Sequence, residues 1–574
     1  MRTATLPCAY NDYDRQTLMG STLDSAQCVP LEVFNDQGKG RGIRSAEAIE
    51  EGKCILKLTP AIAVLDDAHL NNTCSGCFAL PSNPLGGTTA GSLLRCSGCQ
   101  IVRYCSKNCQ RSDWPNHKLE CPVFRSQRPR VLPTAVRAVM RILRLPRDGE
   151  VWNGFQGLMS HRDEVKEAGG PKEEMVTLFS RAAKEYSEEN ELDIASVESI
   201  FSTFISNCLS LLIASFDEVG LTADPLVCLL NHSCSPNAAV VFENKVLTIR
   251  SVRAISPKEE ITISYVNHLQ RRDIRRRELK EKWFFSCECA ACARDESENA
   301  RDPRECFTCA NCRKLIPPPL KSEHSTEKLA CPSCNKAQRF SWAELEKKEE
   351  KTLAISEDRK MRADRWQLYW ALRELHVTNM WPARRTPLLP LYYHTFNVAL
   401  NEQDFLAAFR HSIYIHTALR LNSDRGTDLD PVAVVQTFAA AKLASYLASE
   451  PEQLVDVIQQ LDLLKLAWLL LVDADMVVGM THGDGSRFAK QVRAVKDEHR
   501  VNSLGLDGGR FCAESEQVLR GANASEEALE EVTRVQALAR EMAARVSAGH
   551  CGGVELNTRK CETARKLSID SRLT

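Results

Sequence analysis

Residues 224–242 read DPLVCLLNHSCSPNAAVVF, residues 247–265 read LTIRSVRAISPKEEITISY, and residues 283–292 read WFFSCECAAC. In order, these segments carry an Asn-His pair, a lone cysteine, a tyrosine that closes an apolar alternation, and a Cys-x-Cys-x2-Cys cluster. The residues concerned are Asn231, His232, Cys234, Tyr265, Cys287, Cys289 and Cys292. Amide, imidazole, phenol and thiol groups are the ones that bind cofactors and metals, so these segments form the candidate functional centre.

The same segments predict β-structure. Apolar residues on both sides of Glu243-Asn244 signal a β-hairpin. Ile261, Ile263 and Tyr265 alternate with polar residues, as expected of a half-buried strand. Tyr265 therefore ends a strand, where its hydroxyl either projects into a site or bonds a backbone carbonyl within the core.

Length and charge limit the class of protein. A chain of 574 residues is too long for one ordinary core, which predicts two to four domains. Lys and Arg total 74 against 75 Asp and Glu, so the net charge of -1 argues against a chain that is basic overall and binds nucleic acid. Hydrophobic residues make up 43%, which is typical of a globular protein.

The 24 cysteines are the unusual feature of the composition. The first residues lack the apolar core of a signal peptide, and no apolar run reaches membrane-spanning length; the longest, Leu466–Val472, has seven residues. We therefore expect no membrane and a reducing compartment, the cytoplasm, the nucleus or both. In such a compartment clustered cysteines indicate metal sites rather than disulfides.

Eight candidate metal ligands lie between residues 74 and 121. Their spacings are Cys-x2-Cys twice, Cys-x3-Cys, and His-x3-Cys, from Cys74, Cys77, Cys96, Cys99, Cys105, Cys109, His117 and Cys121. Paired ligands at these spacings suit tetrahedral zinc, and eight ligands make two closed structural sites. The spacing does not decide which pairs share an ion.

Two further thiolate sets follow downstream. Cys287, Cys289 and Cys292 leave tetrahedral zinc one ligand short, and Cys234 is the natural fourth. A separate four-thiolate pattern, typical of a zinc ribbon, consists of Cys309, Cys312, Cys331 and Cys334.

The remaining patterns are weaker. Gly38, Gly40 and Gly42 alternate with Lys39 and Arg41. Such a glycine-rich turn lets a backbone pass close to a ligand, although an ordinary β-turn is the simpler interpretation. The spacing matches neither a Rossmann fingerprint nor a P-loop.

Most of 150–222 and of 340–545 reads as helix, including an amphipathic run at 200–216. Arg137, Arg141 and Arg144 fall on one helical face, which predicts a solvated surface or, alternatively, contact with phosphate or an acidic partner.

The NHSCSPN segment, the tyrosine and the cysteine cluster together resemble the catalytic half of a SET-domain lysine methyltransferase. YCSKNCQRSDWPNHKLEC at 104–121 is closely similar to a MYND finger, so the chain resembles the SET and MYND domain (SMYD) family. The resemblance covers 28–295 with specific motifs and extends loosely to 545. It implies an α+β multidomain protein with a β-rich SET fold, an inserted MYND finger, a post-SET zinc site, a zinc-ribbon-like segment and an all-α TPR-like lobe.

The expected domain boundaries follow from this. They are an N-terminal extension (1–27), the first part of SET (28–73), the MYND finger (74–121), a helical insertion (122–200), the SET catalytic core (201–268), post-SET (269–295), the zinc-ribbon-like segment (305–336), the helical TPR-like lobe (340–545) and a disordered tail (546–574). The ribbon departs from the family pattern.

The resemblance also implies roles for single residues. One zinc takes Cys74, Cys77, Cys105 and Cys109, and the other takes Cys96, Cys99, His117 and Cys121. Tyr265 is the catalytic residue and also contacts S-adenosylmethionine, with Lys39, Arg41, His161, Asn207, Asn231, His232, Trp283 and Phe285. Without the family, His161 is a surface histidine, Asn207 a helix-face amide, and each aromatic residue part of a core. Relatives often have tyrosine where this chain has Trp283.

The implied function is S-adenosylmethionine-dependent N-methylation of protein lysines, histone or non-histone. The cofactors are S-adenosylmethionine and zinc, with two ions in the MYND finger, one in post-SET and one in the ribbon. Expected partners are lysine-bearing proteins, and proline-rich or other peptides at the MYND finger and the helical lobe. The alternative is a non-catalytic adaptor with a degenerate SET domain; DNA binding is the weakest interpretation, since no groove-reading helix is evident.

Overall fold

The computed structural model describes residues 29–36, 40–80, 92–212, 218–267, 270–293, 302, 304–318, 328–420, 429–450, 461–502, 505–521 and 525–547. Lys39, the N-terminal extension and the tail beyond 547 lie outside these residues. The chain forms two compact units: the first is 1–265 with 279–286, and the second is 266–278 with 287–574.

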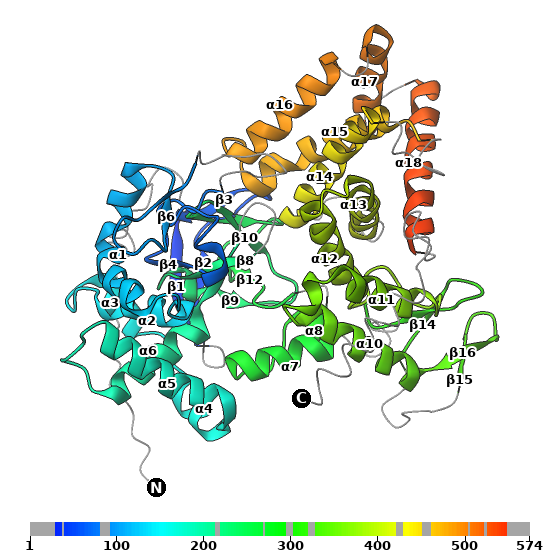
Figure 1. Ribbon diagram of the computed structural model, residues 1–574. Coiled ribbons are helices and arrows are strands. Elements are labelled where there is room, and N and C mark those ends of the chain that lie inside the picture. The colour runs from blue at the N-terminus through cyan, green and yellow to red at the C-terminus, as the bar shows by residue number, and fades with distance from the viewer. Residues whose placement is uncertain are drawn as a thin grey trace. The chain divides into compact units, whose positions relative to one another are not determined.

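Small antiparallel sheets form the centre of the first unit (Figure 1). One sheet has the order β10-β11-β3, a second has the order β4-β8-β7, and β1 pairs with β2. The bounds are β1 Leu31–Asp36, β2 Gly40–Ser45, β3 Cys54–Leu58, β4 Ile62–Leu65, β7 Leu209–Leu212, β8 Glu218–Ala223, β10 Ala238–Glu243 and β11 Val246–Ser251.

The predicted hairpin is confirmed as β10 and β11. Its two-residue turn is Asn244-Lys245, one residue later than predicted, because Glu243 still pairs with Val246. Asn244 has a φ of 57°, the left-handed conformation that asparagine tolerates in a two-residue hairpin turn. The predicted strand at 261–265 is shorter than expected: only β12, Thr262–Ile263, forms, and it pairs in parallel with β9, Asn231–His232.

The described part of the first unit contains the helices α1 to α6, of which α3 to α6 lie within the predicted helical region 150–222. Their bounds are α1 Lys107–Gln127, α2 Thr134–Leu143, α3 Glu150–Gln156, α4 Arg162–Ala168, α5 Gly170–Tyr186 and α6 Ile194–Asn207. The prediction of a helix to residue 216 is wrong, since α6 stops at Asn207 and Leu209–Leu212 forms β7. Pairing of β7 with β8 overrides the local apolar period.

Strand β4 separates two hydrophobic cores. Ala63 and Leu65 pack with the sheets and the residues around the MYND cysteines, whereas Ile62 and Val64 pack with the helices α2, α3, α5 and α6. Successive side chains on a strand point to opposite faces, so one buried strand serves both cores.

The predicted solvated arginine face on α2 is wrong for Arg137 and Arg141, whereas Arg144 is exposed. Arg137 is 1% exposed and donates to the carbonyls of Leu65 (2.7 Å) and Leu132 (3.0 Å). Arg141 donates to the carbonyl of Ala63 and to Glu120, at 2.7 and 2.8 Å. These guanidinium groups are therefore used within the chain and do not form a phosphate site.

The second unit contains two small hairpins and a run of helices (Figure 1). The hairpins are β13 Phe307–Thr308 with β14 Leu315–Ile316, and β15 Lys328–Ala330 with β16 Ala337–Ser341. The helices are α8 Ala290–Ala293, α10 Trp342–Glu357, α11 Arg365–His376, α12 Leu388–Asn401, α13 Phe405–Arg420, α14 Pro431–Ala448, α15 Leu463–His482, α16 Arg487–Asn502, α17 Gly505–Leu519 and α18 Glu526–Ser547. Helix α7, Arg272–Trp283, begins in the second unit and ends in the first.

Helix α14 departs from the expectation that no apolar segment reaches membrane-spanning length. Among the helices described, it alone is long and apolar enough to cross a membrane, by length and composition only. In the structure 67% of that 18-residue window is buried, and α14 packs against α13 and α15. This is the burial expected of a core helix.

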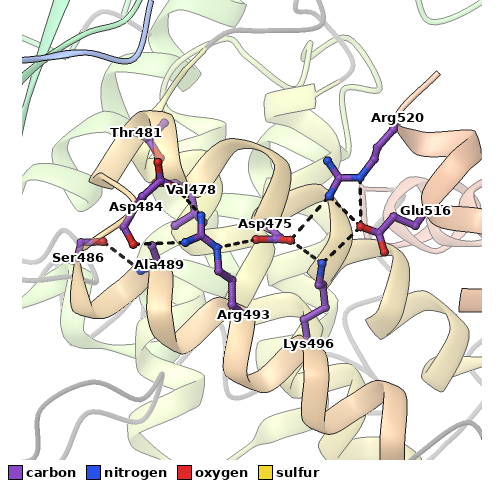
Figure 2. A network of polar contacts seen from close by, with 10 residues as sticks. All are labelled: Asp475, Val478, Thr481, Asp484, Ser486, Ala489, Arg493, Lys496, Glu516 and Arg520. Carbon is purple, nitrogen blue, oxygen red and sulfur yellow. Dashed lines mark hydrogen bonds and ion pairs between the residues drawn. The ribbon is translucent and has the colours of Figure 1, made fainter. Parts of the chain in front are cut away.

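An ion-pair network joins α15, α16 and the end of α17 (Figure 2). Asp475 lies at its centre and accepts from Arg493 at 3.1 Å and from Lys496 at 2.5 Å. Arg520 joins through Glu516, 2.8 Å away. Because every charge in this network has an opposite partner, we assign it a structural role.

Candidate functional site

The eight upstream ligands form two groups in the pairing that the resemblance implies. In each group the ligand atoms lie within 4.8 Å of one another: Cys74, Cys77, Cys105 and Cys109, and Cys96, Cys99, His117 and Cys121. The sulfurs of Cys105 and Cys109 are 3.4 Å apart, and those of Cys77 and Cys105 are 3.7 Å apart. A tetrahedron with zinc–sulfur bonds of about 2.3 Å has edges of about 3.8 Å, so the donor set fits zinc.

The ribbon cysteines form a third such group, within the second unit. Cys309 lies 3.7 Å from Cys334, and Cys312 lies 3.6 Å from Cys331, sulfur to sulfur. The two Cys-x2-Cys pairs occupy the turns of the hairpins β13–β14 and β15–β16.

Four Cys-x2-Cys pairs share one local turn. In each, the carbonyl of the first cysteine accepts a hydrogen bond from the N–H four residues later, and that later residue has a positive φ. The pairs of first cysteine and later residue are Cys74 and Phe78, Cys96 and Gln100, Cys309 and Arg313, and Cys331 and Asn335. The repetition shows that the local sequence alone shapes these ligand turns.

The remaining predicted metal site would combine residues of both units. Cys234 follows β9 in the first unit, whereas Cys287, Cys289 and Cys292 lie in the second, where the N–H of Cys292 donates to the carbonyl of Cys289 (2.8 Å). This four-thiolate site stays a prediction.

Tyr265 lies in a group of aromatic rings in the first unit. Its hydroxyl donates to the carbonyl of Leu230 at 2.5 Å. Its ring centroid is 5.3 Å from those of His232 and Trp283, and Phe285 lies 6.1 Å from His232. Burial raises the pKa of Tyr265 above its ordinary value, with smaller effects of Cys228 and Glu260, so the phenol stays neutral at physiological pH.

The ring nitrogens of His232 both face groups of its own chain. Nδ1 accepts from the backbone N–H of Tyr265 at 3.0 Å, which in a neutral ring leaves the proton on Nε2. Nε2 lies 3.2 Å from the sulfur of Cys234 and can donate to it. The imidazole therefore connects the backbone of Tyr265 with a predicted metal ligand.

Asn231 is held by β2 and by Glu260. Its amide nitrogen donates to the carbonyl of Arg41 (3.1 Å) and to Glu260 (2.8 Å). A Cβ on Gly42 would lie 2.9 Å from that nitrogen, so only glycine permits this approach. The glycine-rich turn is thus explained here by packing of the chain against itself.

Three other predicted residues meet at residues 157–161, which we call the 157–161 loop. Arg41 donates to the carbonyl of Gly157, and Asn207 donates to that of Met159 (2.9 Å). His161 ends the loop with a φ of 50°, and its ring lies 3.1 Å from Glu164. Residues widely separated in sequence therefore converge on one short segment.

Two residues of this region were not singled out from the sequence. Phe284 stacks on His161 with ring centroids 5.3 Å apart, and Glu260 holds Asn231. The aromatic run WFF gave a signal for Phe284, whereas a glutamate before a strand carries none. Lys39 lies outside the described residues.

The comparisons with known proteins bear on this arrangement. The family model of the MYND finger matches residues 71–121. SET domain and MYND-type zinc finger protein 6 of Schizosaccharomyces pombe is 31% identical over 265 residues, which are 46% of this chain and 52% of that protein. The chain is thus similar to proteins of the SET and MYND domain family.

Two further relatives give the extent of the match. Histone-lysine N-methyltransferase SMYD3 of Homo sapiens is 29% identical, over 47% of this chain and 62% of that protein. Histone-lysine N-methyltransferase ASHR1 of Arabidopsis thaliana is 26% identical, over 82% and 96%. The chain thus spans about half the length of the Schizosaccharomyces pombe relative and most of the Arabidopsis one. A solved SET domain of LSMT bound to lysine and AdoHcy aligns with 88% of this chain and 97% of that one, at 12% identity and a TM-score of only 0.28.

Proposed function

We propose that this chain is an S-adenosylmethionine-dependent protein-lysine N-methyltransferase. Relatives named as histone-lysine N-methyltransferases support the reaction class. The observation that carries the proposal is the partly buried Tyr265, whose hydroxyl is fixed by Leu230 beside Asn231 and His232. In this proposal 28–73 and 201–268 form the SET domain, which the MYND finger interrupts, and 340–545 form a TPR-like lobe.

The asparagine amides suit the amino-acid end of the cofactor. Both amide hydrogens of Asn207 are used, by the carbonyls of Met159 and Thr203, and both of Asn231 by Arg41 and Glu260. The hydrogen-bond network thereby orients each Oδ1 as the acceptor that remains. Two such oxygens can accept from a ligand ammonium group.

The aromatic rings suit a cation. S-adenosylmethionine, when bound, supplies the methyl group from its sulfonium. The rings of Tyr265, Trp283 and Phe285 can stabilise that positive charge, and His232 adds a neutral imidazole face. Arg41, His161 and the undescribed Lys39 complete the cofactor-binding set that we propose.

Tyr265 acts in this proposal by position and not as a base. Its proton is donated to Leu230, so the phenol oxygen presents lone pairs to an incoming amine. A free lysine has a pKa of about 10.4 and must be neutral to attack. The apolar aromatic surroundings disfavour the ammonium form, and no enzyme nucleophile is needed because the reaction is a direct displacement.

Zinc has a structural role in this proposal. Each ligand group supplies four donors, which closes the coordination and leaves no open position for a substrate. We propose four ions: two in the MYND finger, one bound by the ribbon, and one bound by Cys234, Cys287, Cys289 and Cys292. The substrates are lysine-bearing proteins of the cytoplasm or nucleus.

The test is transfer of labelled methyl from S-adenosylmethionine to proteins of a cell lysate, with wild type, Tyr265→Phe and Tyr446→Phe. Tyr446 is 40% exposed in the second unit and serves as the matched control. Label that is lost only with Tyr265→Phe supports the enzyme. No label from folded, zinc-loaded wild type, together with no cofactor binding by calorimetry, would sink the proposal in favour of an adaptor.

A further inference from the structure

The C-terminus of α7 is capped by a lysine from α5. The last carbonyls of a helix have no partner within the helix. Lys172 supplies one here: its Nζ donates to the carbonyls of Glu281 (3.3 Å) and Lys282 (3.4 Å). A cation at this end of a helix is also favoured by the helix dipole.

The same ammonium lies over the ring of Phe284, the residue that follows α7. Nζ is 4.3 Å from the ring centroid, a cation–π contact. Phe284 has a φ of 59°, the left-handed conformation that terminates a helix and is strained for a bulky residue. The ring also stacks on His161, with an angle of 30° between the planes. Contacts from helix α5 and from the 157–161 loop therefore hold an unfavourable backbone conformation.

The neighbours of Phe284 are the aromatic residues of the candidate site. Trp283, immediately before it, contacts Tyr265, and Phe285, immediately after it, contacts His232. A change in the backbone at Phe284 would move both rings. Lys172 is only half-buried and lies near Lys282, so its position is maintained against repulsion between two cations.

We propose that Lys172 is a positioning residue, which caps α7 and covers Phe284 so that Trp283 and Phe285 are held against Tyr265 and His232. Its catalytic consequence rests on the proposed function; the positioning itself does not. The aromatic surface beside Tyr265 is then formed before the substrate binds, which saves the cost of ordering it.

Hydrogen exchange tests the positioning without an activity assay. Lys172→Met keeps the length of the side chain but removes its donors and charge. We expect backbone amides at 283–286 to exchange roughly tenfold faster, because local opening becomes easier. Lys172→Arg should restore protection, since a guanidinium can also donate to carbonyls and cover a ring. The control is Lys166→Met, an exposed lysine of α4, which should leave these amides unchanged.

Steady-state methyl transfer tests the consequence. Lys172→Met should lower kcat by roughly tenfold, since the rings beside the reacting groups lose their alignment. The KM for S-adenosylmethionine should change less than kcat, and Lys172→Arg should recover most of the loss.

The outcomes separate the two proposals. Unchanged exchange at 283–286 in Lys172→Met overturns the positioning role, as does equal acceleration throughout the chain. If Lys172→Met fails to fold, Phe284→Leu removes only the ring face, and the same local acceleration is expected. Local acceleration in a protein without any methyl transfer would leave the positioning role standing and refute the proposed function.

Discussion

The phenol hydroxyl of Tyr265 donates to the backbone carbonyl of Leu230 across 2.5 Å. Leu230 directly precedes the Asn-His pair, so this bond ties the segment that follows β12 to the NHSC segment. The two segments are also joined by the parallel pairing of β9 with β12. This hydrogen bond is compatible with both a structural and a catalytic role of Tyr265. The hydroxyl proton is donated within the chain, and the phenol oxygen can still accept a hydrogen bond.

Tyr265→Phe should lower methyl transfer by roughly 10²-fold through kcat, because the amine loses its orienting oxygen. It should cost only about 1 kcal/mol of unfolding free energy, the net value of one hydrogen bond. Chemical denaturation and steady-state kinetics measure the two effects. A loss of activity that merely follows a large loss of stability would contradict the catalytic role.

Substitutions by Asn and Gln should separate the two hydrogen bonds of His232. His232→Asn keeps an acceptor near the position of Nδ1, for the N–H of Tyr265, while His232→Gln keeps a donor near that of Nε2, for Cys234. We expect His232→Ala to cost about 1–3 kcal/mol, because the N–H of Tyr265 loses its acceptor. Each mimic should recover part of this, measured by denaturant unfolding. Identical losses in all three variants would refute the two-contact description.

Zinc removal should affect the two units differently. The MYND ligands share a core with the SET strands, including Ile43 and Ile249, so Cys99→Ala should remove zinc and lower the melting temperature of the catalytic unit. Cys312→Ala should also remove one zinc ion but leave S-adenosylmethionine binding unchanged. Atomic emission measures the metal, and calorimetry measures the cofactor. Loss of cofactor binding in Cys312→Ala would contradict this division.

The network in Figure 2 predicts a pH dependence of stability. Burial would raise the pKa of Asp475, but the hydrogen bonds from Lys496 and Arg493 outweigh it and lower the pKa below 3.8. Because the pKa of this carboxyl is lower in the folded than in the unfolded protein, ionised Asp475 stabilises the folded state at pH values above the pKa of the unfolded chain. This contribution is lost as the pH falls through the pKa of the folded state. Stability should therefore fall below about pH 4.

Asp475→Asn should remove this part of the pH dependence and cost about 1–3 kcal/mol at pH 7, because Lys496, whose side chain is 12% exposed, loses its nearest carboxylate. Asp484→Asn is the matched control: its side chain is 80% exposed although it also binds Arg493, so its loss should cost less than about 1 kcal/mol. Urea unfolding at several pH values measures both. An equal pH dependence of wild type and Asp475→Asn would show that Asp475 contributes nothing to it.

Motifs and the family resemblance singled out most residues of the candidate site, yet the contacts among these residues could not be predicted from them. Asn207 and His161 were singled out by family resemblance, and the structure places both at the 157–161 loop. Lys172 carries no local signal, since a lysine in the first turn of an amphipathic helix usually faces water. Only the approach of α7, 109 residues later, gives it two carbonyls and a ring to contact.

The sequence by itself determined the metal-ligand turns, the β10–β11 hairpin and most of the helices. These depend on residues within a few positions of one another: Cys74 and Cys77 need only a local left-handed turn at Phe78. Tertiary structure alone decided that Leu209–Leu212 is a strand, that Arg137 is buried and that Arg141 is largely covered. Leu209–Leu212 forms a strand because pairing with β8 outweighs the helical period of the local sequence. The two arginines leave water because carbonyls of β4 accept their hydrogen bonds.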